Sequence, residues 1–126
     1  MMSKHILIVD DNADNRKLLA WLLEDEEMSW AEAETAEAAL EAIEEGRFDA
    51  VLMDVSLPGM SGTEATERLR RDPRYAKLPI IAVTAHAIKG ESEKIMASGV
   101  DAIVTKPVDE EKLIALLRDI LDRPQT

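Results

Sequence analysis

The sequence predicts an α/β domain with a doubly wound, five-stranded parallel sheet and five helices. Short apolar runs alternate along the chain with longer segments whose apolar residues recur at helical spacing. The runs are mostly continuous, which is typical of parallel strands buried on both faces and joined by right-handed crossover helices. With 126 residues the chain has the length of one domain, and we expect residues 1–126 to form one.

The strands are expected where a run of apolar residues stops at polar or turn-forming residues. They cover residues 6–9, 29–34, 50–54, 80–84 and 102–105. The second is the weakest, because Trp30 and its alanine neighbours stand between acids, and we accept it because an alternating order leaves room for a strand there. The third is followed within five residues by the turn-forming pair Pro58-Gly59. Asp54 should therefore stand where a buried strand ends and a loop begins.

The helices are expected between and after these strands. They cover residues 14–25, 35–46, 63–71 and 87–98, and a last helix follows Asp109. Asp14 and Asp109 are the expected caps of the first and last helices, because a short side-chain oxygen can accept from unpaired backbone N–H groups. The expected buried stripe of the first helix consists of leucines, namely Leu18, Leu19, Leu22 and Leu23. The fourth helix is the least apolar, and Gly90 weakens it.

Composition excludes several classes of function. Twenty-six acidic and fifteen basic residues give a formal net charge of −11, which argues against binding to the phosphate backbone of nucleic acid. The lack of cysteine excludes disulfides, thiolate metal sites and a cysteine nucleophile, and it fits a reducing cytoplasm. No stretch reaches the roughly 18 apolar residues of a membrane span, and the amino end carries no cleavage signature. We expect a cytoplasmic protein without nucleic-acid or membrane partners.

Polar residues stand at the ends of four predicted strands. In the flavodoxin-like strand order 2-1-3-4-5, the first and third strands are neighbours, and ligands bind beyond their carboxyl ends. Asp10, Asp11 and Asp54 would meet there, and the fourth and fifth strands would bring Thr84 and Lys106 to the same edge. Taken singly, each residue has an ordinary explanation as a turn acid, a β-former or a solvated lysine. Their joint placement indicates a site.

The three carboxylates predict phosphoryl-transfer chemistry. Converging acids repel one another, which raises a pKa or recruits a cation. Oxygen ligands without histidine or cysteine favour a hard ion such as Mg²⁺, which keeps waters that a phosphate can replace. His5 and His86 are not expected to be ligands, because neither has a second histidine at ligand spacing. Asp54 would then be a nucleophile that accepts a phosphoryl group, with Thr84 donating a hydrogen bond and Lys106 neutralising charge.

Four motifs of the sequence carry a family resemblance. They are Asp10-Asp11, residues 53–62, Thr84-Ala85 and Lys106-Pro107. With these motifs the chain resembles, over essentially its whole length, a response-regulator receiver domain of the CheY-like superfamily. In sequence order it is also similar to single-domain regulators of the CheY and DivK kind, and residues 87–90 resemble the loop of DivK-like proteins and of receivers within hybrid kinases.

The resemblance implies a role for each site residue. Asp54 would accept phosphate from a phosphohistidine donor, which is a histidine kinase or a histidine phosphotransfer protein. The implied metal ligands are oxygen groups, namely Asp11, Asp54 and the backbone carbonyl of Ser56, with Asp10 acting through water. Thr84 and Lys106 would contact the phosphoryl group. The resemblance also implies a cis peptide bond between Lys106 and Pro107.

One position departs from the pattern of the family. Receivers usually have Tyr or Phe three residues before the lysine, where the ring rotates together with the threonine, but this chain has Ile103. Either the smaller apolar side chain follows Thr84 inward, or signalling uses another surface. The residues two positions beyond Asp54 and Thr84 are Ser56 and His86, which flank the family's hydrolytic water and are expected to tune the lifetime of the phosphate.

The main hypothesis is a phosphorylation-dependent switch that binds an output protein and catalyses only its own phosphorylation and dephosphorylation. The alternative is a Mg²⁺-dependent, phosphatase-like enzyme with an Asp nucleophile, although such hydrolases usually carry a further acid where this chain has Ser56. A third hypothesis is a scaffold that keeps the fold without being phosphorylated. The sequence leaves open a monomer or a phosphorylation-dependent dimer.

Overall fold

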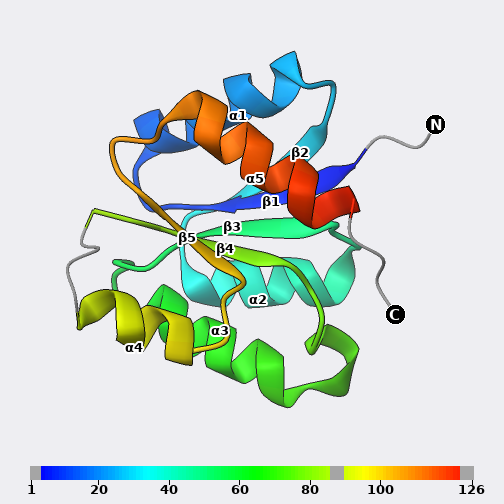
Figure 1. Cartoon of the computed structure of the whole chain (residues 1–126). Helices are drawn as coiled ribbons and strands as arrows, with labels where there is room; N and C mark the ends of the chain where they lie inside the picture. The colour runs from blue at the N-terminus through cyan, green and yellow to red at the C-terminus, as the bar shows by residue number, and fades with distance from the viewer. Residues whose placement is uncertain (1–3, 86–89, 123–126) are drawn as a thin grey trace.

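The computed structural model describes residues 4–85 and 90–122, and it has the predicted architecture (Figure 1). Five parallel strands lie in the order β2-β1-β3-β4-β5, which confirms the predicted topology. The strands are β1 His5–Val9, β2 Ser29–Ala33, β3 Ala50–Asp54, β4 Ile80–Thr84 and β5 Ala102–Thr105. The helices are α1 Ala13–Asp25, α2 Ala36–Glu45, α3 Gly62–Arg71, α4 Glu91–Ala97 and α5 Glu110–Asp122, with a short 3₁₀ helix η1 at Pro73–Tyr75.

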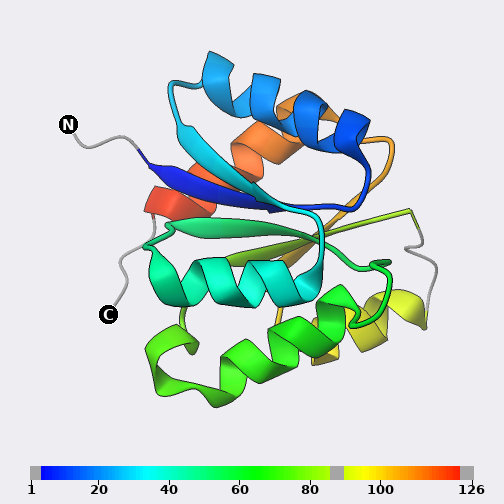
Figure 2. The same ribbon diagram turned by 180° about the vertical axis from the view of Figure 1, so that it is seen from behind.

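Two layers of helices enclose the sheet. α1 and α5 cover one face, and α2, α3 and α4 cover the other (Figures 1 and 2). Successive residues of a strand point to opposite faces, so Leu7 belongs to one apolar core and its neighbours Ile6 and Ile8 belong to the other. Every residue of β3 and β4 is buried, as expected for the continuous apolar runs.

β5 is less buried than a strand covered on both faces. Ala102 and Ile103 are half-buried, Thr105 is exposed, and only Val104 is buried. The physical reason is its place at the edge of the sheet, where a strand has a neighbour on one side only. β2, the strand at the opposite edge, shows the same effect, because Ala33 is its one buried residue.

The cap of α1 corrects one prediction. Asn12, not Asp14, caps the helix, because its Oδ1 accepts from the backbone N–H groups of Asp14 and Asn15 at 2.9 and 3.1 Å. Asp14 instead lies in the first turn, where its charge is favourable beside the positive end of the helix dipole. The predicted cap of α5 is confirmed, since Asp109 accepts from the backbone N–H of Lys112 at 3.2 Å.

The inward face of α1 also differs from the predicted stripe of leucines. The residues that it buries are Arg16, Leu19, Ala20 and Leu23. Leu18 is 39% exposed, and Leu22 is half-buried. The buried face includes Ala20 and Arg16 in place of Leu18 and Leu22. The guanidinium of Arg16 donates to the buried backbone carbonyl of Asp10 and to the exposed side chain of Glu32.

The fourth helix was predicted over residues 87–98, and the structure has it over Glu91–Ala97. Residues 87–89 lie outside the described residues. Ile95 is the one side chain that α4 buries, in agreement with its weak apolar pattern. Among the helices of the described ranges, none combines the length and hydropathy of a membrane span.

Candidate functional site

The predicted acids meet at the carboxyl edge of the sheet. Asp54 is the last residue of β3, and Asp10 follows β1, which is hydrogen-bonded to β3. Carboxylate oxygens of Asp10, Asp11 and Asp54 all lie within 4.8 Å of one another. Asp10 and Asp54 are buried, whereas Asp11 is exposed. We call these three residues the acidic cluster.

Lys106 brings a positive charge into the acidic cluster from the end of β5. Its Nζ lies 3.1 Å from Asp10 Oδ2 and 3.2 Å from Asp54 Oδ2. Its backbone N–H donates to the carbonyl of Thr84 at 2.8 Å, which fastens the segment after β5 to the end of β4. Thr84 is buried at that end, on the strand next to that of Asp54. The peptide bond between Lys106 and Pro107 is cis.

Backbone N–H groups hold the other oxygens of the two buried acids. The N–H of Asn12 donates to Asp10 Oδ1 at 2.9 Å, and the N–H of Ser56 donates to Asp54 Oδ1 at 3.0 Å. Each buried carboxylate thus has a partner at both oxygens, with Lys106 at the second. Asn12 was not among the predicted site residues. The sequence indicates Asn12 only by its position, directly after Asp10-Asp11 and directly before the start of α1.

The surroundings shift the pKa of both central groups. Burial raises the pKa of the Asp54 carboxyl, and the charge of Asp10 adds to this, while the Ser56 N–H and Lys106 lower it without reversing the shift. Burial lowers the pKa of Lys106, but the hydrogen bond with Asp10 and the charges of both acids outweigh burial, so the pKa of Lys106 is raised. The site therefore favours the charged form of Lys106, and it disfavours the ionised form of Asp54 unless further positive charge is brought to it.

The acidic cluster has the composition of a site for a hard divalent cation. All its side-chain ligand atoms are oxygens, and three carboxylates with one ammonium group leave a net charge of −2 when all are ionised. Mg²⁺ prefers such oxygens and binds through few carboxylates. Of the two histidines, His5 lies at the start of β1, at the other end of that strand, and His86 lies outside the described residues. The residues that are present fit Mg²⁺.

The sequence matches the response regulator receiver domain family over residues 6–118. The chain belongs to this family. Receiver domains bind Mg²⁺ in an acidic pocket and interact with histidine kinases and downstream effectors of two-component systems. They are not ordinarily enzymes acting on a separate substrate, so membership does not favour the phosphatase-like alternative.

Two curated relatives show how receivers occur. Sensor protein GacS of Pseudomonas syringae pv. syringae is 42% identical over 111 residues, which are 86% of this chain but 12% of GacS. Polar-differentiation response regulator DivK of Brucella anthropi is 37% identical over 120 residues, which are 95% of this chain and 98% of DivK. This receiver thus spans a small part of the sensor protein and nearly the whole of the regulator.

Two solved structures share the receiver fold. The receiver domain of sensor histidine kinase PA1611 of Pseudomonas aeruginosa PAO1, solved with a magnesium ion coordinated in its active-site cleft, has a TM-score of 0.90 at 29% identity and covers 97% of this chain and 100% of that one. Chemotaxis protein CheY4 of Vibrio cholerae has a TM-score of 0.88 at 26% identity, covering 94% and 99%. The CheY-like fold of this receiver is therefore established.

Gly62 places the first turn of α3 against the acidic cluster of the receiver. A Cβ atom at this position would lie 2.1 Å from the backbone oxygen of Asp54 and 2.9 Å from Cγ of Met53. The N–H of Gly62 donates to the carbonyl of Val55 at 3.1 Å, which joins the helix start to the end of β3. Gly62 is the last residue of the motif at 53–62, and its role in packing is not evident from that motif. Its signal is a poor helix former placed directly after the capping residue Ser61.

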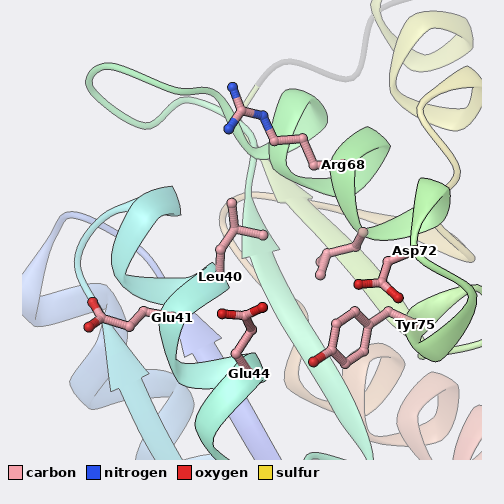
Figure 3. Close-up of a pocket in the computed structure, with 7 residues that line it drawn as sticks. Leu40, Glu41, Glu44, Arg68, Asp72 and Tyr75 are labelled. Carbon is pink, nitrogen blue, oxygen red and sulfur yellow. The ribbon is translucent and has the colours of Figure 1, made fainter.

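A hollow of about 360 Å³ lies between α2 and α3 of the receiver (Figure 3). The residues that line it are Leu40, Glu41 and Glu44 of α2, Arg68 and Leu69 of α3, Asp72 between α3 and η1, and Tyr75 of η1. None of them belongs to the acidic cluster. The hollow is therefore separate from the candidate site.

We expect Asp54→Asn to stabilise the metal-free receiver at neutral pH. The pKa of Asp54 is raised above its ordinary value of 3.8, so ionisation of this group lowers the free energy of unfolding once the pH exceeds that value. Asn removes the charge and keeps an acceptor for the N–H of Ser56. The melting temperature in EDTA should rise by about 3 °C, which corresponds to roughly 1 kcal/mol in a domain of this size.

The rise in melting temperature of Asp54→Asn over wild type should become smaller at acidic pH. As the pH falls from 7 through the raised pKa of Asp54, the wild-type carboxyl becomes neutral and loses its disadvantage. Asp122→Asn, at the exposed end of α5, is the matched control and should leave the melting temperature unchanged. An Asp54→Asn protein that melts below wild type at pH 7 would contradict the argument.

Proposed function

We propose that the chain is a single-domain, cytoplasmic response regulator that accepts a phosphoryl group on Asp54 and thereby switches its binding to an output protein. One observation carries the proposal: the Asp54 carboxylate lies within 4.8 Å of those of Asp10 and Asp11 and 3.2 Å from Nζ of Lys106. The match to nearly all of DivK supports action by residues 1–126 as one receiver. The donor is a histidine kinase or a histidine phosphotransfer protein.

In the proposed step, an oxygen of the Asp54 carboxylate attacks the phosphorus atom of a phosphohistidine. A P–O bond forms and the P–N bond breaks, and the imidazole keeps the electron pair and takes up a proton. The product is an aspartyl phosphate. Attack by water on the same phosphorus later returns the carboxylate and releases phosphate, so the only reactions that the chain catalyses are its own.

The neighbouring residues are proposed to neutralise the charge of the transferring group. The Lys106 ammonium already lies beside the Asp54 carboxylate, which would accept the phosphoryl group. The Thr84 hydroxyl would donate a hydrogen bond to that group from the next strand. The proposed metal-holding groups are Asp10 through water, and directly Asp11, Asp54 and the backbone carbonyl of Ser56. Bound Mg²⁺ supplies positive charge to the phosphoryl oxygens.

The output of the switch is proposed to run through Thr84, Ile103 and α4. Ile103 is half-buried in β5 and packs against the core under α2, α3 and α4, and it pairs with Ala82, two residues before Thr84. A Thr84 drawn towards the phosphoryl group would let Ile103 shift in the same direction. α4 is the element that responds, because Ile95 is its one buried anchor.

Labelling tests the assignment of Asp54. The purified protein is incubated with Mg²⁺ and either acetyl phosphate or a phosphorylated histidine phosphotransfer protein, and its intact mass is measured. We expect one added phosphoryl group that hydroxylamine removes, as it does from acyl phosphates. Asp54→Asn should lose the label, and Asp122→Asn should keep it. Full labelling of Asp54→Asn would overturn the proposal.

Turnover separates the switch from the enzyme. With a phosphate monoester in excess, a response regulator should show no sustained release of phosphate, because Ser56 occupies the place of the acid that such hydrolases usually need. Steady release that Asp54→Asn abolishes would instead favour the phosphatase-like alternative. A protein that takes up no label from either donor would favour a scaffold.

A further inference from the structure

Arg16 is a buried charged residue that contacts the acidic cluster only through backbone. Within residues 4–85 and 90–122, the buried charged side chains are Asp10, Asp54 and Arg16. Nη1 of Arg16 donates to the backbone carbonyl of Asp10 at 2.7 Å. A buried guanidinium requires partners, and this carbonyl is its shortest contact. Arg16 therefore reaches the candidate site without facing into it.

The carbonyl of Asp10 belongs to the peptide plane that links two carboxylates of the cluster. Because a peptide unit is planar, the direction of this carbonyl fixes the N–H of Asp11 and the points from which both side chains leave the backbone. The N–H of Asp10 donates to the carbonyl of Ala33 at 3.1 Å. With Arg16 on the carbonyl, the backbone of Asp10 is held on both sides.

The two acids at the end of β2 hold Arg16 in turn. Its Nε donates to Glu32 Oε1 at 3.0 Å, and its Nη2 to Glu34 Oε1 at 3.3 Å. The three acceptors lie around one planar guanidinium, which presents its donors in a rigid fork. A lysine has a single ammonium group and cannot reproduce this geometry. The sequence signal is a base on the same helical face as Leu19, Ala20 and Leu23.

We propose that Arg16 is a positioning residue that sets the Asp10–Asp11 peptide for Mg²⁺ binding, with Glu32 and Glu34 as its supports. This inference rests on the proposed function, since it takes the acidic cluster as the metal site. Groups that orient metal ligands change metal affinity when they are removed, although they do not touch the ion. Arg16 acts here through the backbone of its target.

A Mg²⁺ titration of the full chain tests the proposal. The dissociation constant is measured from the backbone amide signals of Asp11, Asn12 and Ser56 in NMR spectra of wild type and Arg16→Met. We expect Arg16→Met to weaken Mg²⁺ binding about tenfold. The ¹³C signal of the Asp10 carbonyl should move in the same variant before any metal is added, because that carbonyl loses its donor.

Arg70 provides a matched control near the amino ends of the strands, away from the acidic cluster. It also donates to backbone carbonyls, those of Gly99, Tyr75 and Leu78, each at 2.8 Å. These residues lie before the starts of β4 and β5, away from the carboxyl ends. Arg70→Met should lower the stability of the fold and leave the dissociation constant for Mg²⁺ within twofold of wild type.

The outcomes separate positioning from plain stabilisation. If Arg16→Met is less stable but binds Mg²⁺ as tightly as wild type, Arg16 is only structural and the inference is overturned. Arg16→Lys should restore part of the affinity, and if Arg16→Met does not fold, weaker binding by Arg16→Lys supports the inference and unchanged binding overturns it. A wild type that binds no Mg²⁺ contradicts the proposed function itself, and the inference with it.

Discussion

Gly62→Ala should destabilise the receiver by about 3 kcal/mol, at the upper end of what an overpacked interior loses. The added methyl group would lie 2.1 Å from the backbone oxygen of Asp54, and a main-chain atom cannot rotate away as a side chain can. The start of α3 must therefore move away from β3. Urea unfolding measures the loss, and the melting temperature should fall by about 10 °C.

Gly46→Ala is the control for this substitution. A Cβ at Gly46 would be 3.5 Å from the carbonyl of Ala42, which is ordinary contact, and the residue has a φ of −131° that alanine adopts without strain. Its stability should stay within about 0.5 kcal/mol of wild type. A Gly62→Ala protein as stable as Gly46→Ala would show that the close approach is not needed.

Lys106→Met should destabilise the receiver by a similar amount in metal-free buffer. Nζ of Lys106 contacts both buried carboxylates, at 3.1 and 3.2 Å, and methionine fills a similar volume without the charge. Removal of one partner from a buried ion pair costs about 3 kcal/mol, because the remaining charge stays buried. The loss should shrink as the pH falls, since a protonated Asp54 needs no counter-charge.

Added Mg²⁺ should restore part of the stability of Lys106→Met, because it brings positive charge to the same acids. Lys112→Met serves as the control, since Lys112 is exposed in the first turn of α5. It should melt as wild type does under all these conditions. If Lys106→Met were equally stable in EDTA at neutral pH, the lysine would not be neutralising the buried acids.

The site could be predicted from the sequence where it depends on strand ends. Continuous apolar runs located β3 and β4, and the strand order then brought Asp10 beside Asp54. Lys106 followed from the same rule, because every parallel strand ends at one edge of the sheet. These predictions rest on periodicity and topology, which a sequence expresses directly.

Other features depend on distances that a sequence does not express. Asn12 and Asp14 are both of residue types that commonly cap helices. α1 begins at Ala13, one residue earlier than predicted, and this start places Asn12 at the capping position. The burial of Arg16 depends on acceptors 16 and 18 residues away, Glu32 in β2 and Glu34 directly after it. The role of Gly62 appears only once α3 is seen to touch the backbone of β3.

The ion pairs of Lys106 join residues that are synthesised early to one that is synthesised late. They join this residue to Asp10 and Asp54, which lie 96 and 52 positions earlier in the chain. A nascent chain that has emerged from the ribosome only as far as β4 already carries Asp10, Asp11 and Asp54, but it lacks Lys106. Such an intermediate, or a product truncated before β5, holds repelling acids with no lysine to join them. The acidic cluster thus gains its lysine only after β5 has been made.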